Sequence, residues 1–197
     1  MKLTLVDGDL VLRPLETSDS AAWTEVRRRN AAWLTPWDAT NPPESGELAP
    51  SFRGMVRRLR SEARAGRSIA LAMVVRGRFA GQVTLGGITW GSLRSAYIGY
   101  WIDQAVAGHG YTPRAVAMIS DYAFFHLRLH RIEINIRPEN AASLRVVEKL
   151  GYRYEGVRRA YLHIDNGWRD HRSFALCVDE VPGGLLSRLR EQSSHLG

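Results

Sequence analysis

Two short segments of the chain carry residue types that could bind an anionic ligand and assist a transfer reaction. The first is AGHGYTP, residues 107–113, between an aromatic-rich segment and a helical pattern. Gly108 and Gly110 allow a tight backbone turn. Thr112 is a good N-cap for the following helix, and Pro113 suits its first position. The turn would leave free N–H groups at the positive end of a helix, which suits a pyrophosphate, although an ordinary tight turn shares these features.

The second segment is PENAAS, residues 138–143, at the start of the next helical pattern. Asn140 is an N-cap candidate, and Ser143 falls in the first turn, near the positive helix end. The amide of Asn140 could bind the amide-bearing arm of a ligand, and the hydroxyl of Ser143 could protonate a departing thiolate. Helix capping alone is the simpler interpretation of this segment in isolation.

Alternating strands and helices must position these segments. Periodicity predicts strands at residues 9–13, 69–75, 79–88, 95–102, 131–136, 152–160 and 168–178, and helices from Thr17 or Ser18 to 30, then at 53–67, 113–125 and 141–150. Asp165-Asn166-Gly167 predicts a hairpin turn, and the proline-rich residues 33–50 predict an irregular loop. We expect one α+β domain over residues 1–181, followed by a small helix and tail over 182–197.

Composition describes a protein with one core and a strong positive charge. The 197 residues carry a formal net charge of +7, and 45% of them are hydrophobic. No segment approaches the roughly 20 apolar residues of a membrane span, so we expect a cytoplasmic protein without membrane contact. The lone Cys177 lies in an apolar run and is interpreted as core packing rather than as a nucleophile.

The densest positive charge lies between residues 53 and 67. Arginines recur there at intervals that place them on one face of a helix: Arg53, Arg57, Arg60, Arg64 and Arg67. A solvated helix face explains this pattern, and contact with RNA or an acidic partner is the alternative.

In combination, these segments resemble the GNAT superfamily in its RimJ/RimL branch, which acetylates protein N-termini. The resemblance rests on YIGYWI (97–102), GHGY (108–111), DYAF (121–124), LHRIE (129–133), PEN (138–140), Ser143, EKLGY (148–152), EG (155–156) and YLHIDNGWRDH (161–171), which occur in the family's order. It implies the GNAT fold, an α+β fold with a mixed, mostly antiparallel central sheet flanked by helices. A splayed strand pair in that sheet would bind acetyl-CoA.

The resemblance also implies roles for individual residues. The backbone of Trp101, Ile102 and Asp103 would pair with pantetheine, and the amides of Gly108, His109, Gly110, Tyr111 and Thr112 would bind the pyrophosphate. Asn140 would bind the pantetheine arm, and Ser143 would be the general acid for the CoA thiolate. Arg145 and Lys149 could reach the 3′-phosphate or adenine, or form a solvated face. No metal is expected.

The chain departs from the family pattern in two places. Its phosphate loop has Ala107 where Arg or Gln is usual and Thr112 where Gly or Ala is usual, which predicts weakened CoA binding. Tyr97 stands where many relatives carry an acidic residue, so the obvious general base is missing. Tyr97, or a water held by it and Asn135, is our candidate for proton removal, against a role for Tyr97 in packing.

A site without a strong base suits an amine of low pKa. A protein α-amino group titrates near ~7.8 and a lysine near ~10.4, so we predict acetylation of a protein N-terminus, such as that of a ribosomal protein. The acceptor would lie beside Trp33, Trp37 and Tyr161. The alternatives are a small-molecule amine or lysine acyltransferase on the same fold, and a ribosome- or RNA-binding protein with degenerate catalysis.

Overall fold

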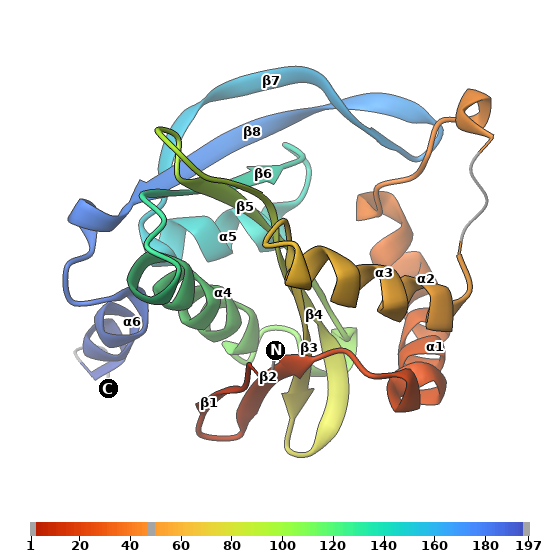
Figure 1. Ribbon diagram of the computed structural model, residues 1–197, viewed down its shortest axis with the longest axis horizontal. Helices are drawn as coiled ribbons and strands as arrows, with labels where there is room; N and C mark the ends of the chain where they lie inside the picture. The colour runs from red at the N-terminus through yellow and green to blue at the C-terminus, as the bar shows by residue number, and fades with distance from the viewer. Residues whose placement is uncertain (1–2, 47–49, 195–197) are drawn as a thin grey trace.

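A mixed sheet organises the residues that the computed structural model describes, which are 3–46 and 50–194. Within these residues the sheet has eight strands in the order β1-β2-β3-β4-β5-β6-β8-β7, and β5–β6 is its one parallel pair (Figure 1). The strands are β1 Leu5–Asp7, β2 Leu10–Pro14, β3 Ile69–Val75, β4 Arg78–Thr89, β5 Ser95–Ile102, β6 Arg131–Ile136, β7 Arg153–Ile164 and β8 Gly167–Cys177. The predicted α+β fold class is confirmed.

The last hairpin differs from its prediction at one end. Asp165 and Asn166 have φ of 50° and 56°, as a tight hairpin turn with both central residues left-handed requires. However, β7 continues to Ile164 instead of ending at Ala160. The register between β7 and β8 shifts between Arg158 and Leu162, and Ala160 has a φ of 45°. This bulge interrupts the alternation of side chains, which is why the pattern ended too early.

Helices cover both faces of the sheet. The helices are α1 Ser20–Arg29, α2 Ala31–Leu34, α3 Phe52–Arg64, α4 Tyr111–Asp121, α5 Ala141–Leu150 and α6 Leu185–Ser194. Figure 1 shows α4, α5 and α6 on one side of β2–β5, and α1, α2 and α3 on the other. The larger core lies under α4, where Val116 and Ile119 are fully buried. A smaller core between α1, α3 and the sheet contains Val26 and Val56.

The segment from Trp33 to Pro50 is more ordered than predicted. Its first part is helical, since α2 extends to Leu34 and a 3₁₀ turn follows at Thr35–Trp37. Pro36 sits in the first turn of that 3₁₀ helix, where its fixed φ and missing N–H are tolerated, so the proline does not prevent helical structure there. Residues 47–49 of the predicted loop lie outside the described residues.

The C-terminal helix packs on the rest of the chain. Leu185 and Leu189 of α6 are buried in the larger core, and the carboxylate of Asp121 accepts the N–H groups of Leu185 and Leu186 at 2.6 and 3.0 Å. A domain limit at residue 181 stays a prediction. Across the described ranges, every helix is too short or too polar to cross a membrane.

Candidate active site

A cleft opens where β5 and β6 diverge. The two strands pair only from Ser95↔Arg131 to Tyr97↔Glu133, although both continue beyond that point. The space between them has a volume of about 360 Å³. It is lined by Trp37, Ala39, Tyr97, Ile98, Gly99, Tyr100, Ile134, Asn135, Ile136, Arg137, Asn140, Ser143, Tyr161, Leu162, Ile164 and His171. Five residues predicted from the sequence for substrate binding or catalysis therefore meet here with Asn140.

One wall of the cleft is built from β5. A Cβ atom at Gly99 would meet no atom within 4 Å, so this position leaves open space in the middle of a strand. Tyr97 is 47% exposed, and its ring lies over the backbone of Gly86 and Gly87. A Cβ atom at Gly86 would come within 2.7 Å of the Tyr97 ring, so those glycines are what allow the tyrosine to lie flat. Tyr97 is thus packed on one side and faces the cleft on the other.

The start of α5 contributes the opposite wall. The side chain of Asn140 caps the helix, because its Oδ1 accepts the N–H of Ser143 at 3.0 Å. The Tyr100 hydroxyl donates to the Ser143 carbonyl at 3.5 Å, and burial raises the pKa of Tyr100, so this phenol stays protonated. Capping and ligand binding are compatible, since capping uses Oδ1 and leaves the Asn140 NH₂ group and the Ser143 hydroxyl beside the cleft.

The glycine turn before α4 has the geometry of an anion site but a different cap. Gly108 and Gly110 both have a φ of 81°, which favours glycine. Gly110, not Thr112, occupies the N-cap position, and α4 begins at Tyr111. The prediction for Thr112 was wrong because the left-handed Gly110 turns the chain into the helix early, which places Pro113 third in the helix. The exposed His109 ring is hydrogen-bonded to the Ala107 carbonyl at 3.0 Å.

The side chains of three predicted cofactor residues point elsewhere. Trp101 packs against Phe79 and Trp23 in the smaller core. Asp103 is buried in an ion pair with Arg29, and its Oδ1 accepts the N–H of Ala105 at 3.2 Å. The third, Tyr111, donates its hydroxyl to Asp9 at 2.6 Å. This hydrogen bond, together with Arg114 and Arg76, lowers the pKa of Asp9 to about 2. The backbone of Asp103 is also engaged within the protein, because its N–H donates to the Ala80 carbonyl at 2.7 Å and its carbonyl accepts the N–H of Val106 at 3.1 Å.

Three further predicted residues do not line the cleft. The Trp33 indole N–H donates to the Ile102 carbonyl at 3.3 Å, so Trp33 binds the end of β5 and does not line the cleft. Arg145 and Lys149 are exposed on α5. Because they follow Ser143 on the same helix, they remain available to a ligand that extends beyond the cleft.

A polar network covers the face of β6 that carries Asn135. Ser173 donates to Asn135 Oδ1 at 2.8 Å, and the Asn135 amide donates to the Tyr161 hydroxyl at 3.4 Å. Arg158 donates to the same hydroxyl at 3.3 Å and forms an ion pair with Glu133. Asn135 therefore has both ends of its amide engaged, which makes it a fixed group in the cleft wall.

Sequence reasoning missed the two residues with basic side chains among the described residues that line the cleft. Arg137 donates to the Pro36 carbonyl at 2.8 Å and stacks over Trp37, with 5.5 Å from guanidinium carbon to ring centroid. His171 is buried on β8 and contacts Tyr161. Both residues continue an alternating strand pattern on the face of Asn135, and following that alternation to the strand ends would have found them.

Cys177 was predicted to pack in the core, and this prediction is wrong. It is partly exposed at the end of β8, and its thiol lies within 4.8 Å of one ligand atom each of His130 and Asp179. Burial of the thiol and the nearby Glu180 carboxylate raise the pKa of Cys177, which favours the thiol over the metal-binding thiolate. This group lies at the other end of β6 from the cleft, so it does not contact the site.

A parallel strand pair that splays over a cleft, beside two helix N-termini, defines a class of protein that binds an acyl-CoA between its strands. The chain belongs to the acetyltransferase (GNAT) family, whose domain model matches residues 9–153. It is an acetyl-CoA-dependent N-acetyltransferase, and acetyl-CoA is its acetyl donor. The open space at Gly99, the glycine turn and the free groups of Asn140 and Ser143 fit such a donor.

Relatives show how closely the chain follows this family. The protein is 37% identical to Mycobacterium smegmatis RimJ, solved in complex with CoA-disulfide, with a TM-score of 0.87 over 93% of this chain and 89% of that chain. It is 28% identical to the Escherichia coli [ribosomal protein uS5]-alanine N-acetyltransferase over 92% of this chain and 95% of that protein. It is 43% identical to Bacillus subtilis "Probable N-acetyltransferase YjcK", over 50% of this chain and 55% of that protein.

Proposed function

We propose that the protein transfers the acetyl group of acetyl-CoA to the N-terminal α-amino group of a protein, such as a ribosomal protein. The observation that carries this proposal is the absence of Asp and Glu among the described residues that line the cleft. Glu133, beside Tyr97 in the sheet, is held by ion pairs to Arg131 and Arg158. A cleft without a free carboxylate suits an amine of low pKa. The relatives named for ribosomal substrates support the same acceptor, and such an acceptor would place the reaction in the cytoplasm.

The donor would be held by groups on the α4 and α5 side. Backbone amides from Gly108 to Thr112 would bind the pyrophosphate, and the Asn140 NH₂ group would bind the pantetheine arm. When bound, acetyl-CoA supplies an activated acetyl thioester. The Ser143 hydroxyl, at the positive end of α5, would give its proton to the sulfur as the thiolate leaves.

The acceptor would approach from the other face of the sheet. Trp37 and Tyr161 line the cleft, and Tyr97 of β5 and Asn135 of β6 line it from the two splayed strands. Trp33 would not contact the acceptor. It would support the site indirectly, because its indole N–H donates to the Ile102 carbonyl at the end of β5. Direct attack of a neutral amine needs no covalent enzyme intermediate, so positioning and proton removal are the main tasks of these residues.

The dependence of selectivity on pH tests this acceptor. At pH 7 the fraction of free amine differs by roughly several hundredfold between an α-amino group and lysine, and at pH 9 by only roughly 25-fold. One peptide has a free Ala N-terminus, and the other has a blocked N-terminus and an internal lysine as its only amine. The kcat/KM of the first should therefore be at least tenfold higher, and this ratio should fall as pH rises. Measuring kcat/KM from pH 7 to 9 by mass spectrometry checks this.

Each alternative acceptor has its own signature in that experiment. A lysine preference at pH 7 would overturn the N-terminal proposal, and reaction of small polyamines or aminoglycosides but neither peptide would point to a small-molecule substrate. Binding of acetyl-CoA without transfer to any amine would favour a ribosome- or RNA-binding protein that has lost turnover.

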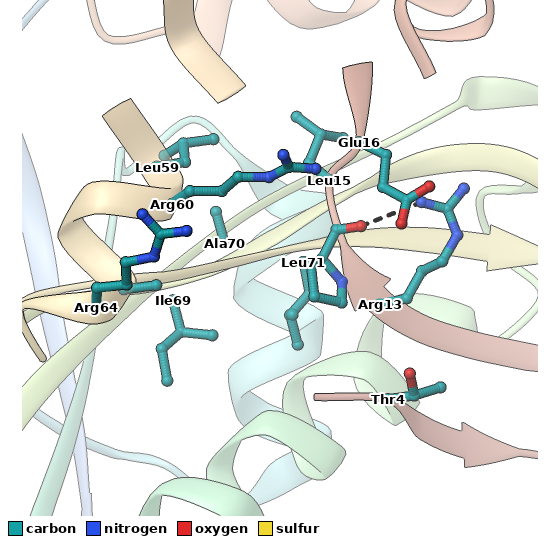
Figure 2. Close-up of a pocket in the computed structure, with 12 residues that line it drawn as sticks. Thr4, Arg13, Leu15, Glu16, Leu59, Arg60, Arg64, Ile69, Ala70 and Leu71 are labelled. Atoms are coloured by element: carbon teal, nitrogen blue, oxygen red, sulfur yellow. Dashed lines mark hydrogen bonds between the residues drawn. The ribbon is translucent and has the colours of Figure 1, made fainter. Parts of the chain in front are cut away.

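We also propose that α3 contacts ribosomal RNA when the acceptor is part of a ribosomal particle. Five exposed arginines of α3 form no ion pair with any residue in the described part of the chain: Arg53, Arg57, Arg58, Arg60 and Arg64. Arg67 was predicted on the same face of the helix. It lies beyond the helix end and forms an ion pair with Glu62. Arg60 and Arg64 line a hollow of about 490 Å³ between α3 and strands β2 and β3. Figure 2 shows these two side chains beside the other residues that line it. Exposed guanidinium groups of this kind bind phosphates.

Charge reversal tests the role of α3. The Arg57→Glu/Arg60→Glu variant should lose about tenfold in kcat/KM for a ribosome-associated acceptor because two phosphate contacts are replaced by repulsion. Its kcat/KM for a free peptide should stay within about twofold, because α3 does not line the cleft. Arg78→Glu/Arg94→Glu, which changes two exposed arginines elsewhere, is the control. Equal losses in both variants would show that only net charge matters.

A further inference from the structure

His171 lies on the acceptor face of the cleft. On β8, Ser173 is directly opposite Asn135 of β6, so the two side chains share a face of the sheet. His171 is two residues away on the same strand and therefore faces the same side as Asn135. It is 3% exposed and lines the cleft together with Ser143. The cleft thus has an imidazole on its acceptor face and a hydroxyl on its α5 wall.

The hydrogen bond of His171 determines which ring nitrogen carries the proton. Nδ1 lies 3.0 Å from the Arg169 carbonyl oxygen. A carbonyl oxygen can only accept, so Nδ1 carries the hydrogen, and Nε2 of the neutral ring carries the lone pair. The Tyr161 ring meets the imidazole edge-on, with centroids 5.5 Å apart and an interplanar angle of 69°. The tautomer and the ring plane are therefore both fixed by the fold.

The surroundings keep this imidazole neutral. Burial lowers the pKa of His171 below its ordinary value of 6.5, and the Arg137 guanidinium acts in the same direction. The hydrogen bond to Arg169 and the carboxylates of Glu139 and Asp170 oppose this shift without overcoming it. Other charged or titratable groups on this face include Tyr161, Arg158, Glu133 and Arg131. A base with a lowered pKa is unprotonated at neutral pH and can take up a proton.

Other groups in the cleft are less suited to proton removal. The Tyr161 hydroxyl oxygen accepts hydrogen bonds from Asn135 and Arg158, so its lone pairs are already occupied. Tyr97 carries a phenol hydroxyl and has no basic nitrogen. The Asn135 amide has no basic nitrogen. Among the described residues that line the cleft, His171 is the one with a basic lone pair.

We propose that Nε2 of His171 is the general base that accepts the proton of the acceptor amine, directly or through one water. This inference rests on the proposed acetyl transfer to an amine. As the nitrogen forms its bond to the acetyl carbon, the bond from carbon to sulfur breaks, and the proton lost by nitrogen passes to Nε2. The sulfur gains one proton from Ser143, which is reprotonated from solvent, and His171 releases its proton to solvent. One proton leaves nitrogen and one reaches sulfur, so the reaction is balanced.

The His171→Asn variant separates base catalysis from structure. Its side-chain NH₂ group can still donate to the Arg169 carbonyl, but it lacks the basic Nε2. We expect kcat to fall about tenfold or more, as the loss of a general base does, while KM for acetyl-CoA stays within about twofold. The wild-type kcat at saturating peptide should fall on the acid side with an apparent pKa below about 6.5, and the variant should lack this limb. His130→Asn, an exposed histidine at the far end of β6, is the control.

The outcomes distinguish this inference from the proposed function. If the wild type acetylates no N-terminal peptide, the proposed function fails and the inference with it. If the wild type is active and His171→Asn keeps its kcat and its acid limb, His171 is not the base. His171→Ala covers the case in which the Asn variant does not fold, since added imidazole can then fill the cavity. Recovery of kcat with imidazole in the folded variant supports the inference, and its failure in a folded variant overturns it.

Discussion

Gly110→Asp is expected to lower the affinity for CoA by roughly a hundredfold or more, a loss of about 2.7 kcal/mol. Gly110 has a φ of 81° and caps α4, where its neighbours' N–H groups would bind the pyrophosphate. An aspartate there places a negative charge beside that anion. A Cβ atom at this position would meet no protein atom within 4 Å, so the substituted side chain has room in the free protein. Calorimetric titration with CoA checks the prediction.

Gly110→Asn is the matched control for this substitution. Asparagine has nearly the same size as aspartate and also tolerates a left-handed backbone, but it carries no charge. If repulsion is the main effect, Gly110→Asn should bind CoA at least tenfold more tightly than Gly110→Asp. Circular dichroism should show both variants folded. Unchanged CoA affinity in folded Gly110→Asp would mean that the pyrophosphate binds elsewhere.

Ser143→Ala is expected to lower kcat about a hundredfold, within the range that general acid catalysis contributes. The KM for acetyl-CoA should change little, because the hydroxyl matters mainly as the thiolate forms. The cap of α5 should survive, since it uses the backbone N–H of Ser143 and not the hydroxyl. Steady-state kinetics at saturating peptide, with melting temperature as the measure of fold, test this.

Ser143→Thr provides the control because it keeps a hydroxyl at the same position. It should retain much more of the wild-type kcat than Ser143→Ala. If Ser143→Ala turns over at the wild-type rate, Ser143 is a structural residue of the helix start, and sulfur takes its proton from water.

Local patterns predicted most of the fold. The bounds of β3, β5, β6 and α5 agree with those expected from periodicity, because each alternates or repeats cleanly between turn residues. Errors occurred where backbone geometry interrupts the pattern. Because of the bulge near Ala160, the predicted strand ended before the true end of β7 at Ile164. Because Gly110 is left-handed, α4 begins earlier than predicted. A single φ value is a property of the folded chain that residue types only partly indicate.

The candidate site was less predictable than the fold. Asn140 and Ser143 belong to one helix start, so their spacing in the chain determines their spacing in space. His171 comes from β8, and its position beside Asn135 depends on strand register between segments far apart in the sequence. The internal contacts of Asp103 and Trp33 likewise depend on tertiary packing. The periodicity of a single segment does not predict contacts of this kind.

The short segment from Pro36 to Thr40 is attached to the rim of the cleft at several points. Pro36 accepts from Arg137, Asp38 pairs with Arg27, and Ala39 forms a β-bridge with Ile164. The N–H of Thr40 also donates to the His163 carbonyl at 2.9 Å.

These attachments bear on the entropy of acceptor recognition. A wall that must order itself around each peptide loses conformational freedom on binding, and that cost subtracts from affinity. Here the freedom of residues 36–40 has already been lost during folding. The wall is therefore preorganised, and it would discriminate among acceptors by shape, with little adaptation to the size of the first residue.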